Sequence, residues 1–112
     1  MEIVNLTTGQ TLAGEARLAD SFFTRLRGLL GSKSLPDGAG LVIKPCNSVH
    51  TFGMNYAIDV VFAAADNRVL KVVPYLGPRR LAACPGSRYV IELPAGTVAK
   101  TGTVPGDMLA WR

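Results

Sequence analysis

The sequence predicts a mainly β fold, or a β-heavy α+β fold, in the form of a small antiparallel β-barrel or sandwich with one helix near residues 21–30. About seven short runs of β-favouring residues are separated by turn signals, at the spacing typical of small barrels and sandwiches. Only one long stretch repeats its apolar residues at helical spacing. Because 112 residues is the usual length of one domain, we expect residues 1–112 to form a single domain.

The N-terminal third is expected to contain a hairpin followed by the helix. Apolar and polar residues alternate at 2–6 and 11–18 on either side of "TTGQ", which predicts a hairpin with Gly9 in its turn. The next segment, "FFTRLRGLL", has the apolar spacing of a helix and is followed by Gly31 as a C-terminal stop. This segment is the predicted helix at 21–30.

The strongest strand signal is at the centre of the chain. Residues 57–73 read "AIDVVFAAADNRVLKVV", with a β-rich run on each side of Asp66-Asn67. Asp and Asn tolerate the positive φ angles of a tight hairpin turn. We therefore predict a hairpin that joins strands near 57–65 and 68–73.

The remaining elements are shorter. "LVIK" at 41–44 predicts a buried strand, "YVIEL" at 89–93 another, and "MLAWR" at 108–112 a last one. Residues 74–88 are rich in proline and glycine and are interpreted as a loop around the sheet. "GTVAKTG" at 96–102 is expected to form one helical turn.

Composition argues against a disordered chain and against a membrane-spanning one. With 48% hydrophobic and 18% charged residues, the chain can form a core. No apolar run approaches the roughly 18 residues needed to cross a bilayer, and "MEIVNLTTGQ" lacks the basic start and apolar centre of a secretory signal. We expect a soluble, cytoplasmic protein with no membrane partner, unless the chain is the mature form of an exported protein.

The net charge of +4 raises the question of a nucleic-acid partner. The basic residues are spread along the chain, and the close pairs are Arg25 with Arg27 and Arg79 with Arg80. No aromatic residues alternate with them to form a platform on which bases could stack. We therefore interpret the charge as solvated surface and expect no nucleic-acid partner.

Three blocks of sequence carry a resemblance to a known family. "RLRGLL", "GLVIKPCNSVHTFGMNYAIDVVFAAADNRVLKVV" and "YVIELPAGTVAKTGTVPGDML" resemble, in order and spacing, the bacterial and archaeal domain of unknown function 192 family, over about residues 16–110. The resemblance implies a compact, mainly β single domain without an established activity. Members similar to this chain often have an aromatic residue where Gly53 stands and a proline where Ala57 stands, so the space beside Met54 differs here.

Cys46 and His50 are the candidates for metal binding. On a helix, residues four apart would share a face, but the β-branched Val49 and Thr51 and the nearby Gly53 disfavour a helix. In an extended chain four residues span roughly 13 Å, which is too far for both side chains to bind one ion. Paired-cysteine zinc knuckles are also absent from the sequence. We predict no metal and no cofactor.

A thiol-dependent enzyme is an alternative. It would need Cys46 or Cys84 beside His50, together with an orienting carboxylate such as Asp59. No known signature of such an enzyme surrounds either cysteine, so enzymatic activity is an open question that we lean against. The sequence also leaves open whether the two cysteines form a disulfide or stay free.

An extended conformation of "CNSVHTFGM" would collect several chemically useful side chains on one face. These are Cys46, Ser48, His50, Phe52 and Met54. A thiol, a hydroxyl, an imidazole, a ring and a thioether together resemble the lining of a small pocket, although the edge of the core would have the same composition. We predict a binding site here, with Asp59 as a further tentative member and His50 in a surface concavity.

Asp59 is unusual because it lies within the apolar run "AIDVVFAAA", where an unpaired carboxylate would be costly to bury. Alternation places it on the face opposite Ile58 and Val60. Arg27, near the end of the predicted helix, is the candidate partner, since a guanidinium can donate two hydrogen bonds to a carboxylate. The alternatives are a structural ion pair between Arg27 and Asp59 and a functional carboxylate near His50.

Three functional hypotheses follow. The first is a binding or accessory module with a shallow site for a small molecule or a peptide, formed by residues 46–59 and 74–88. The second is an enzyme that uses a thiol or the pair His50 and Asp59. The third is a structural domain that interacts through a sheet edge. The ligand, the pathway and the oligomeric state are not determined by the sequence.

Overall fold

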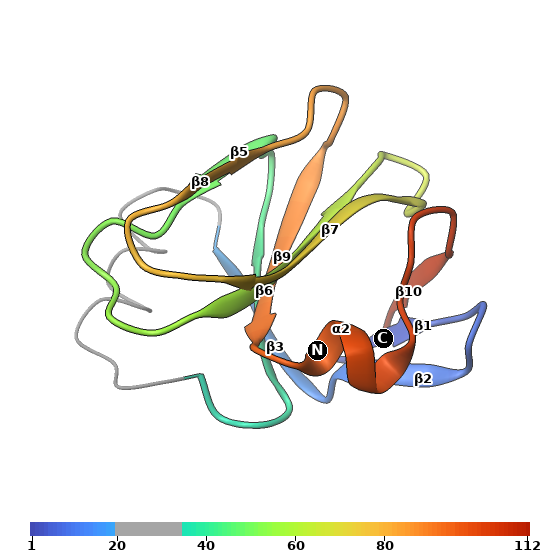
Figure 1. The fold of residues 1–112 in the computed structure, drawn as a ribbon. Coiled ribbons are helices and arrows are strands. Elements are labelled where there is room, and N and C mark those ends of the chain that lie inside the picture. The colour runs from blue at the N-terminus through green and yellow to red at the C-terminus, as the bar shows by residue number, and fades with distance from the viewer. Residues whose placement is uncertain (20–34) are drawn as a thin grey trace.

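The structure is a computed structural model, and it describes residues 1–19 and 35–112. Ten strands and one short helix lie in these two parts of the chain (Figure 1). One sheet has the order β10-β1-β2, a second β3-β4-β9-β6-β7, and β5 pairs with β8 in a two-stranded ribbon. In chain order the elements are β1 (Ile3–Asn5), β2 (Gln10–Ala13), β3 (Glu15–Ala19), β4 (Ala39–Ile43), β5 (Ser48–His50), β6 (Ile58–Ala63), β7 (Val69–Leu76), β8 (Leu81–Ala83), β9 (Tyr89–Pro94), α2 (Thr97–Thr101) and β10 (Leu109–Trp111).

The mainly β class is confirmed. Within the described residues the outer strands of the five-stranded sheet, β3 and β7, do not pair with each other, so this sheet is open and is not closed into a barrel. One pair, β3 with β4, is parallel, which differs from the all-antiparallel arrangement that we expected. Apolar periodicity carries no information on strand direction, which explains the difference. The predicted helix at 21–30 lies outside the described residues.

Both predicted hairpins are present. β1 and β2 pair antiparallel, and Gly9 in their turn has a φ of 77°. Residues 11–18, expected as one strand of this hairpin, are divided between β2 and β3, which belong to different sheets. β6 and β7 pair antiparallel around Asp66 and Asn67. The turn is one residue longer than a two-residue hairpin, because the amide of Ala64 donates to the carbonyl of Arg68 at 2.9 Å. Among the three residues of this turn, 65–67, only Asn67 has a positive φ, 70°. This is the conformation of a three-residue loop that ends in a left-handed residue.

The prediction of a loop over residues 74–88 was wrong. β7 continues through Pro74 to Leu76, and residues 81–83 form β8, which pairs with β5. Pro74 is compatible with this strand because β7 is the outer strand of its sheet. An outer strand pairs on one side only, so a residue without an amide N–H is tolerated there. The predicted helical turn at 96–102 is confirmed as α2.

The five-stranded sheet separates two apolar clusters. Alternate residues of β6 show the division: Val61 belongs to the first cluster, and Val60 and Phe62 belong to the second. The first cluster is shared with the three-stranded sheet and α2, and the second includes Val49 of the ribbon. No helix in the described parts of the chain is long and apolar enough to cross a membrane.

Buried polar side chains connect the first strand to the last turns of the chain. The side-chain amide of Asn5 donates to Thr103 Oγ1 at 3.1 Å and to Asp107 Oδ2 at 2.9 Å. Its oxygen accepts from the backbone amides of Thr7 and Thr8 at 3.0 and 3.1 Å. All hydrogen-bonding groups of this buried side chain are used, which is the condition under which burial of an amide is tolerated.

Candidate functional site

The ribbon formed by β5 and β8 carries the centre of the predicted site. Ser48 pairs with Ala83, Val49 with Ala82 and His50 with Leu81. Because paired residues share a face, Val49 and Ala82 point toward the second cluster. Ser48 and Leu81 are exposed and His50 is half-buried, so the outer face of the ribbon is polar at one end and apolar at the other.

The extended conformation predicted for "CNSVHTFGM" ends at His50, and beyond that residue the prediction was wrong. The amide of Met54 donates to the carbonyl of Thr51 at 3.1 Å, and Gly53 has a φ of 87°. This turn leaves Phe52 exposed and buries Met54 in the second cluster. Glycine at position 53 allows the left-handed backbone that the turn requires.

The turn also fixes the imidazole. His50 Nδ1 accepts a hydrogen bond from the backbone amide of Phe52 at 3.2 Å, and the two rings lie 5.7 Å apart, centroid to centroid. An accepting Nδ1 places the proton of the neutral ring on Nε2. Nδ1 is therefore occupied within the turn.

Thr51, which sequence reasoning did not single out, holds the far end of the ribbon. Its side chain is completely buried. The hydroxyl donates to the carbonyl of Gly77 at 2.6 Å and accepts from the amide of Arg80 at 2.9 Å. The backbone amide of Thr51 also donates to the carbonyl of Arg80 at 3.0 Å. One side chain thus connects the turn after β5 to the turn before β8.

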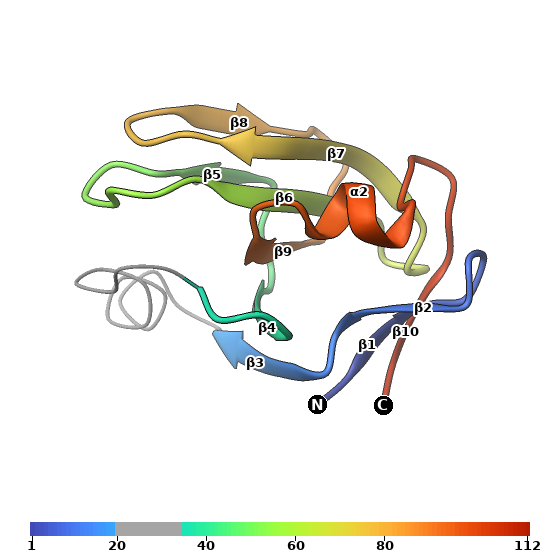
Figure 2. The ribbon, with the colours of Figure 1, turned by 60° about the horizontal axis from the view of Figure 1, so that its bottom comes forward.

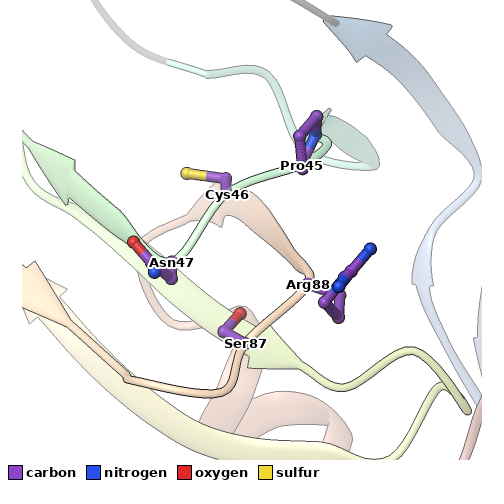
Figure 3. Close-up of a pocket in the computed structure, with 5 residues that line it drawn as sticks. All are labelled: Pro45, Cys46, Asn47, Ser87 and Arg88. Atoms are coloured by element: carbon purple, nitrogen blue, oxygen red, sulfur yellow. The ribbon is translucent and has the colours of Figure 1, made fainter.

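A pocket lies at the other end of the ribbon, where residues 45–47 run beside residues 87–88. Its volume is about 350 Å³ and it is lined by Pro45, Cys46, Asn47, Ser87 and Arg88 (Figure 3). The amide of Cys46 donates to the carbonyl of Arg88 at 3.1 Å, which joins the two segments. The pocket therefore includes one member of the predicted site, Cys46, and the end of the segment 74–88 that we expected to contribute.

The lining side chains differ in how much of their chemistry is available. Ser87 is buried, and its hydroxyl is 2.9 Å from the carbonyl of Tyr89 and 3.3 Å from that of Ala63, so it has a structural role. The sulfur of Cys46 is 3.0 Å from the carbonyl of Ser48. The side chains of Asn47 and Arg88 are exposed, and in the view of Figure 3 the guanidinium extends away from the side on which the sulfur lies. An amide and a guanidinium are thus the groups offered to a ligand.

Asp59 does not join this site. It lies on the face of the central sheet that carries Val61, opposite Ile58 and Val60, as alternation predicted. Its buried carboxylate accepts hydrogen bonds from three backbone amides, those of Tyr75 at 2.9 Å, Gly96 at 3.1 Å and Val98 at 2.8 Å. Arg27, its predicted partner, lies outside the described residues, so the ion pair stays a prediction.

The positions of the cysteines, His50 and Asp59 bear on two alternatives, a metal site and a thiol-dependent enzyme. Cys46 and Cys84 are not joined in a disulfide. Within residues 1–19 and 35–112 no three His, Cys, Asp or Glu side chains gather in a way that could hold a metal ion. Asp59 is on the opposite face of the sheet from Val49 and Met54, which neighbour His50 in sequence. A catalytic group of Cys46, His50 and Asp59 is therefore not assembled in this structure.

Several residues of the site had no signal in the sequence. Asn47, Ser87 and Arg88 come together only because β5 pairs with β8, a pairing between segments about thirty residues apart. Thr51 could have been noticed as a polar residue between the apolar positions Val49 and Met54. Its partners, however, are backbone groups at Gly77 and Arg80, and backbone groups leave no trace in a sequence.

Comparison with known proteins agrees with this architecture. The sequence profile of the domain of unknown function 192 family, described as an uncharacterized ACR, matches residues 3–111. A UPF0127 protein of Pyrococcus horikoshii is 34% identical over 114 residues, which cover 97% of each chain. Another from Thermococcus sibiricus is 30% identical over 97% of this chain and 73% of its own. A crystal structure of a protein of unknown function from Novosphingobium aromaticivorans superposes with a TM-score of 0.84 at 22% identity, over 99% of this chain and 84% of that one.

Proposed function

The chain belongs to the domain of unknown function 192 family, and on this premise we propose that it is a binding module whose pocket takes a small molecule with an anionic group. The observation that carries the proposal is the chemistry of the pocket beside the ribbon. Its five lining residues include a guanidinium and a side-chain amide but no carboxylate. Such a lining favours a carboxylate or a comparable anion over a neutral or cationic ligand.

The dimensions of the pocket support the same class of ligand. A volume of about 350 Å³ is near the lower end of the roughly 300–1,000 Å³ found for small-molecule sites. Pro45 provides an apolar surface beside the polar groups, so a short aliphatic acid fits better than a bare inorganic ion. Because Arg88 lies at the surface, its attraction for the ligand is screened by salt. We expect weak binding.

The backbone around the pocket does not depend on the side chain that we assign to the ligand. The carbonyl of Arg88 accepts from Cys46 at 3.1 Å, and its amide donates to Ala63 at 2.8 Å. Both bonds persist when the guanidinium is removed. Arg88→Gln is therefore a clean test, because it deletes the charge and keeps the architecture.

The experiment is a titration of isotope-labelled protein with acetate, succinate and inorganic phosphate in turn, followed by NMR at low ionic strength. We expect the amide signals of residues 45–47 and 87–88 to shift in a saturable way with a carboxylate. Arg88→Gln should weaken the binding about fivefold to tenfold, as expected for the loss of one charge-assisted contact. Arg17→Gln removes the same charge from an exposed position on β3 and should leave the binding unchanged.

Two results would overturn the proposal. The first is the absence of saturable shifts with any of the three anions. The second is an equal response of the Arg88→Gln and Arg17→Gln proteins, which would show that the anions respond to overall charge and not to this pocket. The expectation that no metal is required is tested in parallel by metal analysis of the purified protein.

A further inference from the structure

The ribbon and the segments that lead into it have an unusual distribution of charge. Residues 44–58 and 67–91 contain no Asp or Glu at all. The same two ranges contain six basic residues: Lys44, Arg68, Lys71, Arg79, Arg80 and Arg88. One of them, Arg68, is near the Asp66 carboxylate at 3.4 Å. The segments that flank the two ribbon strands are thus basic, and the exposed Asp and Glu side chains of the described residues lie outside these two ranges.

Exposed apolar side chains lie at the same end of the ribbon as two of these arginines. Leu81 is 73% exposed and Phe52 is 49% exposed. They are neighbours, since Leu81 pairs with His50 and the His50 ring is 5.7 Å from that of Phe52. Arg79 and Arg80 directly precede Leu81 in the chain and are also exposed. We refer to the surface formed by His50, Phe52, Arg79, Arg80 and Leu81 as the ribbon tip.

The ribbon tip is held in place before any partner arrives. Thr51 fixes Arg80 through hydrogen bonds in both directions, at 2.9 and 3.0 Å. Arg79 has a φ of 58°, a left-handed conformation that is uncommon for a residue with a long side chain. A backbone fixed in this way loses little conformational entropy on association, which favours its use in binding. The ribbon lies on the side of the molecule away from β1, β2 and β10 (Figure 2).

We propose that the ribbon tip is a docking surface for an acidic segment of a partner protein, one that presents carboxylates next to an apolar side chain. The guanidinium groups of Arg79 and Arg80 can each donate two parallel hydrogen bonds to a carboxylate. Phe52 and Leu81, which are exposed on the same ribbon tip, provide an apolar contact. A peptide matches this mixture of two charges and two apolar side chains at close range.

An anionic bilayer is the competing occupant, and the surface fits it less well. Stable attachment to a membrane usually needs a broad apolar face or a lipid anchor in addition to basic charge. The ribbon tip offers only two exposed apolar side chains, on a turn that Thr51 prevents from reshaping. Vesicles therefore serve as an arm of the test.

The test measures fluorescence anisotropy of a labelled synthetic peptide with the sequence Glu-Asp-Glu-Phe-Asp-Glu against the whole protein. The control is a peptide of the same length in which Gln replaces each Glu and Asn replaces each Asp. We expect saturable binding of the acidic peptide only, and weaker binding as salt rises, because exposed charges are screened. The double variant R79N/R80Q should weaken binding about tenfold. Asn is chosen at position 79 because it tolerates the left-handed backbone.

Matched variants distinguish the effect of net charge from the effect of the position of that charge on the surface. R17Q/R112Q removes the same two charges from exposed positions outside the ribbon and should leave peptide binding intact. F52S/L81T removes the apolar part and should weaken binding by a similar factor. Arg88→Gln alters the pocket described above but not the ribbon tip, so loss of small-anion binding with peptide binding intact shows that the two proposals stand apart.

Three outcomes would overturn this proposal. Equal binding of the acidic and the amide peptide would remove the role of charge. Equal losses of peptide affinity in R79N/R80Q and R17Q/R112Q would show that the peptide responds to net charge and not to the ribbon tip. Binding to vesicles of phosphatidylcholine with phosphatidylserine, but not to the peptide, would assign the surface to a membrane. Thermal unfolding of each variant identifies any that fails to fold, and peptide-induced NMR shifts on residues 50–52 and 79–81 of the wild type give a measurement that needs no variant.

Discussion

The carboxylate of Asp59 accepts the backbone amide of Val98 at 2.8 Å across 39 positions of sequence. The same carboxylate accepts the amides of Gly96 and Tyr75. Tyr75 has a φ of 52° and lies where the register between β6 and β7 shifts. One buried side chain thus satisfies amides from an irregular strand and from the start of α2. Asp59 acts as a structural connection between three segments.

Replacing Asp59 with Asn should destabilise the fold strongly. The amide group of Asn would face backbone donors with a donor of its own, and the charge-assisted bonds would be lost, at a cost of about 3–5 kcal/mol. Urea unfolding gives the free energy directly. Asp37→Asn, at an exposed position, should change it by less than about 0.5 kcal/mol. If both variants unfolded at the same urea concentration as the wild type, the structural role of Asp59 would be rejected.

The predicted ion pair between Arg27 and Asp59 can be tested separately. A double-mutant cycle with Arg27→Met and Asp59→Ala isolates the coupling between the two residues. If the guanidinium contacts the carboxylate, the coupling energy should exceed about 1 kcal/mol, because removal of one partner strands the other charge. Additive effects of the two substitutions would mean that the backbone amides alone balance the carboxylate.

Thr51→Val should loosen the ribbon. Valine has nearly the shape of threonine, so the change leaves the carbonyl of Gly77 and the amide of Arg80 without the hydroxyl, at a cost of about 1–3 kcal/mol. We expect faster hydrogen exchange at Arg80 by at least about tenfold, and weaker binding at the ribbon tip. Thr11→Val, at an exposed position on β2, is the control. Unchanged exchange at Arg80 would show that the backbone pairing alone holds this end.

Tyr89 should make stability fall in alkaline solution. Burial raises the pKa of this phenol above its ordinary value of 10.0; the nearby Trp111 indole lowers the pKa in part, and the Asp66 carboxylate raises it again. The pKa of Tyr89 is higher in the folded protein than in the unfolded chain. The contribution of this phenol to the free energy of unfolding is therefore complete below pH 10 and is lost as the pH rises through the folded pKa.

The substitution Tyr89→Phe tests this origin. It removes the hydrogen bond from the phenol to Asn67 Oδ1, 3.0 Å long, and should cost about 1 kcal/mol near neutral pH. The stability of the variant should then depend less steeply on pH above about 10. Absorbance of the phenolate in folded protein gives the titration itself. A slope equal to that of the wild type would place the alkaline loss at other groups.

Gly40→Ala should destabilise the contact between the two larger sheets. An added Cβ at Gly40 would lie 2.8 Å from the Cβ of Ala13 and 3.3 Å from a methyl group of Leu93. Neither β4 nor β2 can move without disturbing its own sheet, so we expect a cost of about 1–3 kcal/mol. Gly14→Ala meets no atom within 4 Å and is the matched control. Equal melting temperatures for the two variants would contradict the close packing.

The parts of the fold that depend on local chemistry were predictable. The turn at Asp66 and Asn67 is determined by two residues suited to turns between alternating strands, and the structure has it there. The face of the sheet on which Asp59 lies also followed from alternation, whereas its complete burial is a finding of the structure. What alternation could not supply was the partners of Asp59, because they are backbone amides from residues far along the chain.

The structure brings together a different set of residues from the predicted site, and ligand binding at this place stays a prediction. The turn at Gly53 separated Met54, which is buried in the second cluster, from His50 and Phe52, since one left-handed residue breaks the alternation on which the prediction depended. β8 was missed because prolines and glycines surround it and only its pairing with β5 makes it a strand. Arg88 entered the pocket through that same long-range pairing.

The two ends of the chain are paired with each other. The amide of Glu2 donates to the carbonyl of Arg112 and the amide of Arg112 to that of Glu2, both at 2.8 Å, so β1 lies between β2 and the last strand of the chain. During synthesis β1 cannot complete its sheet until residue 112 has left the ribosome, which makes this sheet a late step of folding.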